Sequence, residues 1–135
     1  MEKINEILAR QLPHFRSISP KSSVSDALCR MSTQNTDYLI VMDEKEQFLG
    51  LITEQDVARK ALFMNRSLDD TNVREIMSTK LPFADAGDTV EQCMNVMKKH
   101  HVKHLPVFQH FKFMGIVSTD DILDEAITRR VAIFD

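Results

Sequence analysis

Apolar and polar positions follow the same order in the two halves of the chain. Each half has a short extended stretch, a segment with apolar residues at helical spacing, two continuous apolar runs joined by a turn, and a second helical segment. Short continuous apolar runs indicate buried strands, and apolar residues three or four positions apart indicate a helix with one buried face. The pattern therefore predicts a strand, a helix, an antiparallel strand pair and a helix, twice over.

Helix-capping residues and residues that interrupt helices or strands predict where each element begins and ends. In the first half they are a strand at 16–19, a helix capped by Ser23 or Ser25, strands at 38–42 and 48–52, and a helix from Thr53. In the second half they are a strand at 83–84, a helix from Asp88 or Thr89 to His100, strands at 105–108 and 113–117, and a helix from Ser118 to about Arg130.

An internal repeat explains this order. Val24-Ser25-Asp26-Ala27-Leu28 lines up with Val90-Glu91-Gln92-Cys93-Met94 at an offset of 66 residues. Gly50-Leu51-Ile52-Thr53-Glu54-Gln55-Asp56 lines up with Gly115-Ile116-Val117-Ser118-Thr119-Asp120-Asp121 at an offset of 65, and a change of one residue inside a loop is what a duplication tolerates. We predict one integrated module of two repeats that share a core: residues 1–72, with an N-terminal helix and a linker, and residues 73–135, with a C-terminal helix.

Composition and charge narrow the function classes. The 135 residues are 43% hydrophobic and 27% charged, as in an ordinary globular protein, and the net charge of −3 disfavours a nucleic acid as main partner. No apolar run approaches the roughly 18 residues of a membrane helix, and residues 1–13 lack a signal peptide's apolar core. We expect a cytoplasmic protein that does not contact a membrane. Cys29 and Cys93 lie in helical patterns without CxxC spacing, which predicts two buried, reduced thiols.

The repeated stretch at 50–56 and 115–121 has the form Gly, apolar, any, Ser/Thr, any, any, Asp, and we call its copies the first and second motif. Thr53 and Asp56 hold the polar positions of the first motif, and Ser118 and Asp121 those of the second. A helix N-terminus suits a phosphate, and a carboxylate can accept two hydrogen bonds from a ribose diol. The alternative, favoured for a single copy, is that the hydroxyl and the carboxylate only form a capping box. Two matching copies favour a binding function.

Over residues 16–125 the sequence resembles a tandem pair of cystathionine-β-synthase-type (CBS) domains, the Bateman module, and in particular stand-alone bacterial members of that family. The resemblance rests on both motifs, on His104-Leu105-Pro106-Val107 and on Glu75-Ile76-Met77-Ser78. It implies an α+β fold of two β-α-β-β-α repeats packed with pseudo-twofold symmetry. It also implies a regulatory sensor, with no chemistry of its own and no required cofactor, whose two clefts between the repeats bind an adenosine derivative such as AMP, ATP, NAD or S-adenosylmethionine.

The resemblance implies site residues for each cleft. In the cleft ranked first, Asp121 would bind the ribose hydroxyls and Ser118 would lie near the phosphate or ribose. Asp120 departs from the pattern, because a second carboxylate repels phosphate and favours a ligand with few phosphates or a nearby cation. The other candidates there are Lys103 and His104 as positive charges, Tyr38 against the base, Pro106 and Arg16. The other cleft would use Thr53 and Asp56, with the segment 77–82 beside the base and Ile40 in place of the proline of the Leu-Pro-Val pattern.

The sequence leaves three alternatives open. A metal site could use His100, His101, His104 and His110, although no acidic or Cys ligand stands at matching spacing. Catalysis is disfavoured because nucleophile-elbow, zincin, Walker and dinucleotide-binding patterns are absent. A protein-interaction module with vestigial clefts would use the helical apolar patterns near the two ends, which are Ile4, Ile7, Leu8 and Leu12, and Ile122, Leu123, Ala126 and Ile127.

The helices after the two hairpins carry more apolar residues than one packed face needs. These residues are Val57, Ala61 and Leu62 in one helix and Ile122, Leu123 and Ala126 in the other. The resemblance implies a homodimer through these helices, because related pairs associate there, and the surplus of apolar residues supports it. A regulated protein is expected as a further partner. Arg59, Lys60 and Arg66 follow the first motif, and a solvated helix face and loop is favoured for them over phosphate contact.

Overall fold

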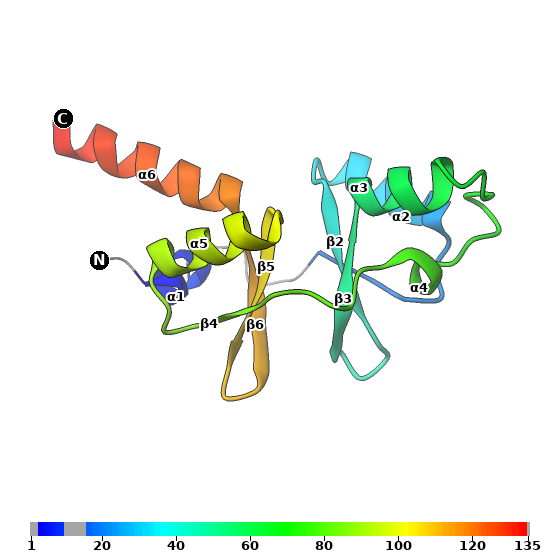
Figure 1. Ribbon diagram of the computed structural model, residues 1–135, viewed down its shortest axis with the longest axis horizontal. Coiled ribbons are helices and arrows are strands. Elements are labelled where there is room, and N and C mark those ends of the chain that lie inside the picture. The colour runs from blue at the N-terminus through cyan, green and yellow to red at the C-terminus, as the bar shows by residue number, and fades with distance from the viewer. Residues whose placement is uncertain (1–2, 10–15, 135) are drawn as a thin grey trace. The chain divides into compact units, whose positions relative to one another are not determined.

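The computed structural model of the protein describes residues 3–9 and 16–134. It divides the chain into two compact units (Figure 1), a first unit, His14–Lys80, and a second unit, Met1–Pro13 with Leu81–Asp135. Within the described part of the chain, no helix is long and apolar enough to cross a membrane.

The first unit is a three-stranded sheet with helices packed on it. Its elements are β1 (Ser17–Ile18), α2 (Val24–Thr33), β2 (Tyr38–Met42), β3 (Phe48–Thr53), α3 (Glu54–Val57), η1 (Ala58–Leu62) and α4 (Val73–Ile76). The strand order is β1-β2-β3, with β1 parallel and β3 antiparallel to β2. Buried residues of every predicted periodic segment form its core, among them Val24 and Met31 of α2, Leu39 of β2 and Ile52 of β3.

The second unit repeats this architecture and adds a helix. Its elements are α1 (Ile4–Ala9), β4 (Ala84–Asp85), α5 (Val90–His100), β5 (His104–Gln109), β6 (Lys112–Ser118) and α6 (Thr119–Phe134). The order β4-β5-β6 again combines a parallel and an antiparallel pair. Side chains of Ser23 and Thr89 accept hydrogen bonds from the amides of Asp26 and Gln92 and so cap α2 and α5. The mixed α+β class and the repeated element order are thus confirmed.

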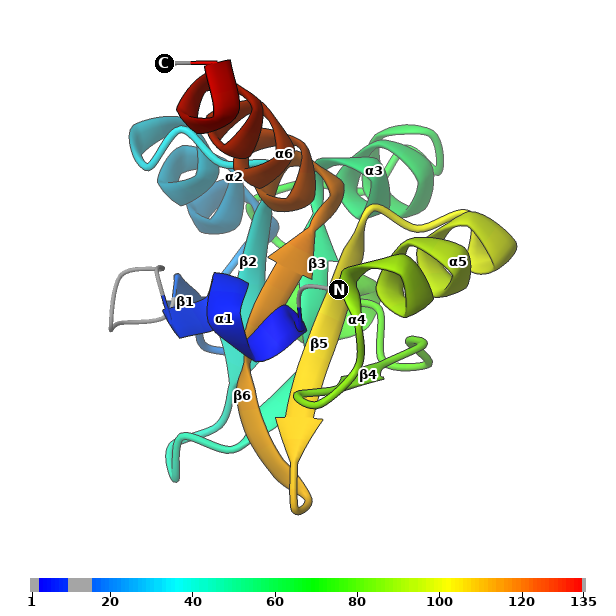
Figure 2. The ribbon, with the colours of Figure 1, turned by 90° about the vertical axis from the view of Figure 1, so that its left-hand side faces the viewer.

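The units differ from the expected repeat boundary at residue 72 in two places. The N-terminal helix, expected with the first repeat, lies against β6 in the second unit (Figure 2). Ile4 and Ile7 are buried in the core of that unit, and the amide of Ile4 donates to the carbonyl of Asp88 at 2.9 Å. Conversely, the segment 73–80, expected with the second repeat, belongs to the first unit. Leu12, the last position of the N-terminal apolar pattern, lies outside the described residues.

Each unit has a core cluster of its own. The prediction of one integrated module stays a prediction.

The cysteine prediction is half wrong. Cys93 is buried, but Cys29 is exposed, because it lies two positions from the buried Ala27 and Met31 and so faces away from the core side of α2. Burial, with a smaller contribution from the charge of Asp88, raises the pKa of the Cys93 thiol to about 11. Cys93 therefore stays protonated and inert at neutral pH.

The helix after the first hairpin also differs from expectation. The assignment of Val57, Ala61 and Leu62 to one helix predicts continuous α-helix, but only one turn, α3, is α-helical before the π-helical segment η1. The amide of Phe63 donates to the carbonyl of Ala58 at 2.9 Å, five residues back. Such insertions of one residue per turn are not visible in apolar spacing over so short a segment.

The turn between β5 and β6 is strained. Gln109 pairs with Lys112, so His110 and Phe111 alone form the loop. Both have positive φ, 51° and 64°, where Asn-Gly is the favoured pair and other side chains cost about 1–2 kcal/mol per residue. The Phe111 side chain is fully exposed, so packing does not offset the strain.

Phe111→Gly is therefore expected to raise the free energy of unfolding by roughly 1 kcal/mol, because relief of strain exceeds the added freedom of the unfolded chain. Urea unfolding measures the change. Gln109→Gly at the end of β5 is the control and should lower stability, since glycine there adds freedom to the unfolded chain without relieving any strain. Equal loss in both variants would contradict the strain assigned to this turn.

Candidate functional site

The first motif forms a closed cap at the junction of β3 and α3. The Thr53 hydroxyl oxygen accepts a hydrogen bond from the Asp56 amide at 3.1 Å. In return, Asp56 Oδ2 accepts from the Thr53 amide at 3.0 Å and from the Thr53 hydroxyl at 3.2 Å. Asp56 is only 7% exposed. The hydroxyl and the carboxylate thus satisfy backbone amides that the start of a helix leaves without partners.

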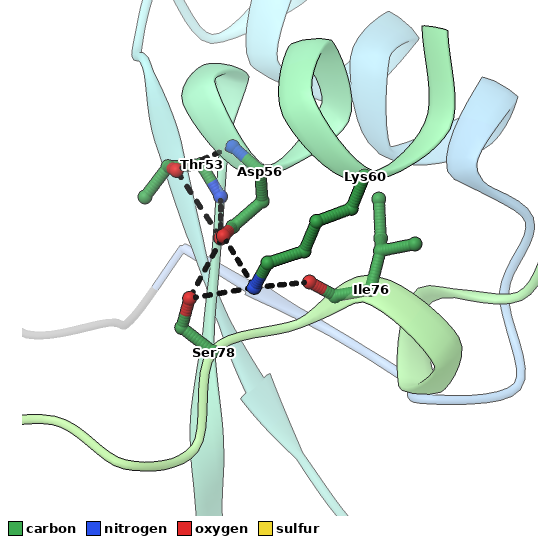
Figure 3. Close-up of polar contacts among 5 residues, drawn as sticks. All are labelled: Thr53, Asp56, Lys60, Ile76 and Ser78. Carbon is green, nitrogen blue, oxygen red and sulfur yellow. Dashed lines mark hydrogen bonds and ion pairs between the residues drawn. The ribbon is translucent and has the colours of Figure 1, made fainter. Parts of the chain in front are cut away.

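Two further donors reach the other oxygen of this carboxylate. The Ser78 hydroxyl donates to Asp56 Oδ1 at 2.8 Å, and Lys60 Nζ lies 3.0 Å from the same oxygen (Figure 3). Lys60 Nζ also donates to the Ile76 carbonyl at 3.1 Å and to the Ser78 hydroxyl at 3.3 Å. Asp56 therefore has two donors on each oxygen, which fills the roughly four acceptor positions of a carboxylate.

A single helical turn, α4, places the Ile76 carbonyl that Lys60 uses. The Asn72 amide donates to Glu75 Oε2 at 2.7 Å, and Arg66 forms an ion pair with the other Glu75 oxygen. The backbone hydrogen bond from Asn72, helped by Arg66, lowers the pKa of Glu75 below its ordinary value. Glu75 is thus ionised at neutral pH and fixes the start of α4.

Steric crowding explains why the first motif has a glycine at position 50. The segment 77–80, which we call the linker segment, pairs with β3 through two hydrogen bonds between Leu51 and Ser78, at 3.0 and 2.7 Å. A Cβ on Gly50 would lie 2.4 Å from the Ser78 carbonyl oxygen. Only glycine allows the linker segment to approach this closely.

The second motif has the same reciprocal cap. Asp121 Oδ2 accepts from the Ser118 amide at 3.0 Å, and the Ser118 hydroxyl oxygen accepts from the Asp121 amide at 3.0 Å. Lys103 and His104 lie beside it, since the Lys103 carbonyl accepts from the Thr119 amide at 3.0 Å and His104 pairs with Ser118. The backbones of Lys103 and His104 thus adjoin the second motif within the second unit, and a role for their side chains at this site stays a prediction.

The two motifs differ in the charges around them. Asp37 and Tyr38 occupy the positions beside the first motif that Lys103 and His104 occupy beside the second. In the sequence, Glu125 matches Lys60, four residues after the motif aspartate. The first carboxylate therefore has a cation on its own helical segment, whereas the basic residues Lys103 and His104 adjoin the backbone of the second motif from the start of β5.

The remaining predicted site residues fall into one unit or the other. In the second unit, Asp120 is exposed in the first turn of α6, and Pro106 is buried in β5 opposite Ile116. Tyr38 and Arg16 belong to the first unit, where the Arg16 carbonyl accepts from the Ile40 amide at 2.7 Å. A role for Tyr38 and Arg16 beside Asp121 stays a prediction.

Sequence reasoning missed the role of Lys60. A solvated helix face was favoured for it, yet its ammonium group contacts Asp56, Ile76 and Ser78. The four-residue spacing from Asp56 was the available signal, because side chains four apart lie on one helix face. For the histidines, the described residues contain no group of three or more His, Cys, Asp or Glu side chains placed to hold a metal ion.

Comparison with known proteins identifies the family. The model of the CBS domain matches residues 5–62 and 73–127. The chain belongs to the CBS domain family. CBS-domain pairs are generally regulatory or ligand-sensing modules, and no enzyme family is indicated for this chain.

Relatives of this CBS chain include stand-alone and larger proteins. It is 25% identical over 122 residues to the CBS domain-containing protein YhcV of Bacillus subtilis, covering 90% of this chain and 84% of YhcV. It is 32% identical over 105 residues, 75% of its length, to the mitochondrial CBS domain-containing protein CBSX3 of Arabidopsis thaliana, of which it spans about half (51%). A solved CBS-domain protein from Burkholderia ambifaria MC40-6 superposes with a TM-score of 0.86 at 28% identity, covering 93% of this chain and 94% of that one.

Gly50→Ala is expected to lower the free energy of unfolding by roughly 1–3 kcal/mol, because the linker segment must move away from β3. Thermal or urea unfolding checks this. Gly87→Ala is the matched control, since a Cβ there would meet the Asp85 side chain at 3.3 Å, which can shift. Equal effects of the two substitutions would show that the close approach at Ser78 does not constrain the fold.

Proposed function

We propose that the chain is a sensor module that binds an adenosine-containing nucleotide at the second motif and signals by conformational change. The observation that carries this proposal is that the backbones of Lys103 and His104 adjoin the capped pair Ser118 and Asp121. The Asp121 carboxylate would accept hydrogen bonds from a ribose diol, as ionised carboxylates accept several. The start of the 16-residue helix α6 and the two basic residues would offset a phosphate charge.

The charges also favour one kind of nucleotide. Asp120 stands exposed in the same helical turn as Asp121, so each added phosphate meets more repulsion. We propose AMP as the first candidate ligand, followed by ATP, NAD and S-adenosylmethionine. We further propose that the module acts in the cytoplasm and has a regulated protein as a partner. We propose that it needs no cofactor, catalyses no reaction, and binds neither a nucleic acid nor a membrane.

Asp121→Ala is expected to weaken nucleotide binding at least tenfold, since two charge-assisted hydrogen bonds of about 1.5–3 kcal/mol each are lost before compensation. The measurement is the shift in melting temperature with each of the four ligands, because a ligand that binds only the folded state stabilises it. In wild type the shift should be largest with AMP.

The controls separate binding from capping. Asp121→Asn keeps a side-chain oxygen for the Ser118 amide but loses the charge, so it should lose ligand response with less loss of stability. Gln92→Ala removes the matching half of the α5 capping box, so it should lower the melting temperature and keep the full ligand response. If Asp121→Ala, Asp121→Asn and Gln92→Ala all keep the full ligand response, Asp121 only caps a helix.

A specific observation also supports the homodimer. Val57, Ala61 and Ile122 are buried within their own units, but Leu62 and Leu123 are 55% and 58% exposed. Phe63, Met64 and Ile127 are exposed as well. Large exposed apolar side chains at the end of η1, just after it and along α6 favour association through these helices.

Light scattering at tens of micromolar chain is expected to give the mass of a dimer, and Leu123→Asp to shift it toward the monomer. Phe111→Asp is the matched control, because Phe111 is equally apolar and exposed but lies on the β5–β6 turn. It should remain dimeric. A monomeric or hexameric wild type would overturn the proposed dimer.

A further inference from the structure

The first motif shares its sequence and its cap with the second, and its carboxylate accepts hydrogen bonds on both oxygens from residues of the first unit. Asp56 Oδ2 accepts from the Thr53 amide and hydroxyl, and Oδ1 faces Ser78 and Lys60 at 2.8 and 3.0 Å. A ribose diol would have to donate two hydrogen bonds to the same carboxylate. With about four acceptor positions filled, it can do so only by displacing internal donors.

The donors that a ribose could displace are Lys60 and Ser78. Thr53 is fixed because its amide and hydroxyl belong to the cap of α3. Lys60 is held by three oxygens, those of Asp56, Ile76 and Ser78, and these match the three protons of its ammonium group. Its side chain is 46% exposed, so the ammonium can exchange these partners for water. The contact is thus satisfied but reversible.

The same contacts hold the linker segment. Ser78 joins β3 through both its backbone hydrogen bonds to Leu51, and its hydroxyl joins the Asp56–Lys60 pair (Figure 3). Lys60 also holds the Ile76 carbonyl, two residues earlier. Loss of Lys60 and of the Ser78 hydroxyl contact would therefore loosen the chain between Ile76 and Lys80, where it leaves the first unit.

We propose that Lys60 and Ser78 form an autoinhibitory latch on the first motif, so that a nucleotide ribose reaches Asp56 only when the latch opens and the linker segment is released. The latch rests on the proposed nucleotide-binding function and adds an asymmetry to it. The wild-type chain binds one nucleotide, at the second motif, where Glu125 replaces the latch lysine. Opening of the latch couples occupancy of the first motif to release of the linker segment from β3.

Calorimetric titration with AMP, repeated with ATP, NAD and S-adenosylmethionine, tests the latch. Wild type is expected to bind one equivalent per chain. Lys60→Met with Ser78→Ala should bind two, and Asp121→Ala added to that pair should leave one. Lys60→Arg, which keeps the cation, and Lys45→Met, which removes a lysine from the exposed β2–β3 turn, should stay at one. Two equivalents in wild type, or one equivalent in both wild type and the latch variant, would overturn the proposal.

Failure of the latch and failure of the proposed function give different results. Binding by the latch variant but not by wild type would reject the site at Asp121 and keep the latch. No binding by any variant would reject both. Amide hydrogen exchange tests the mechanical part without ligand: Lys60→Met should speed exchange at Leu51 and Ser78 by about tenfold and leave Ile40, on the far side of β2, unchanged. Unchanged exchange at Leu51 and Ser78 would reject the release of the linker segment.

Discussion

In both units the helix after the hairpin begins with a hydroxyl and a carboxylate that satisfy each other's backbone amides. The start of a helix leaves several amides without partners, and such a cap is worth about 0.5–2 kcal/mol. At each junction the aspartate is therefore held in place by folding before any ligand arrives. A ligand that uses this carboxylate must share it with the helix. This constraint links stability and binding throughout the structure.

The two copies of the motif differ in the residues around the aspartate that caps the helix. The first carboxylate is buried under Lys60 and Ser78, which complete its hydrogen bonding and fasten the linker segment to β3. The second motif has Lys103 and His104 beside it and Glu125 at the position of Lys60. In our account, the first copy of the motif holds the linker segment in place and the second copy binds the ligand. Gly50 also serves the structural role of the first motif, because a side chain there would collide with the linker segment.

The sequence predicted most accurately the features that depend on a few neighbouring residues, which are the strands and the helix caps. The run at 38–42 coincides with β2, and the caps at Ser23 and Thr89 fall where predicted, because apolar periodicity and capping act over a few residues. The packing of α1 against β6 was missed, since more than 100 residues of chain separate Ile4 from β6. The contact of Asp56 with Ser78 was missed for a similar reason. It depends on the path of the linker segment along β3, which no local pattern encodes.

The most direct test of the account is a crystal structure of the wild-type chain with saturating AMP. The account predicts a ribose bound to Asp121, with Lys60 Nζ still paired with Asp56 and the linker segment still paired with β3. A ribose bound to Asp56 in the wild-type chain, with the Lys60 contact broken and no nucleotide at Asp121, would contradict it.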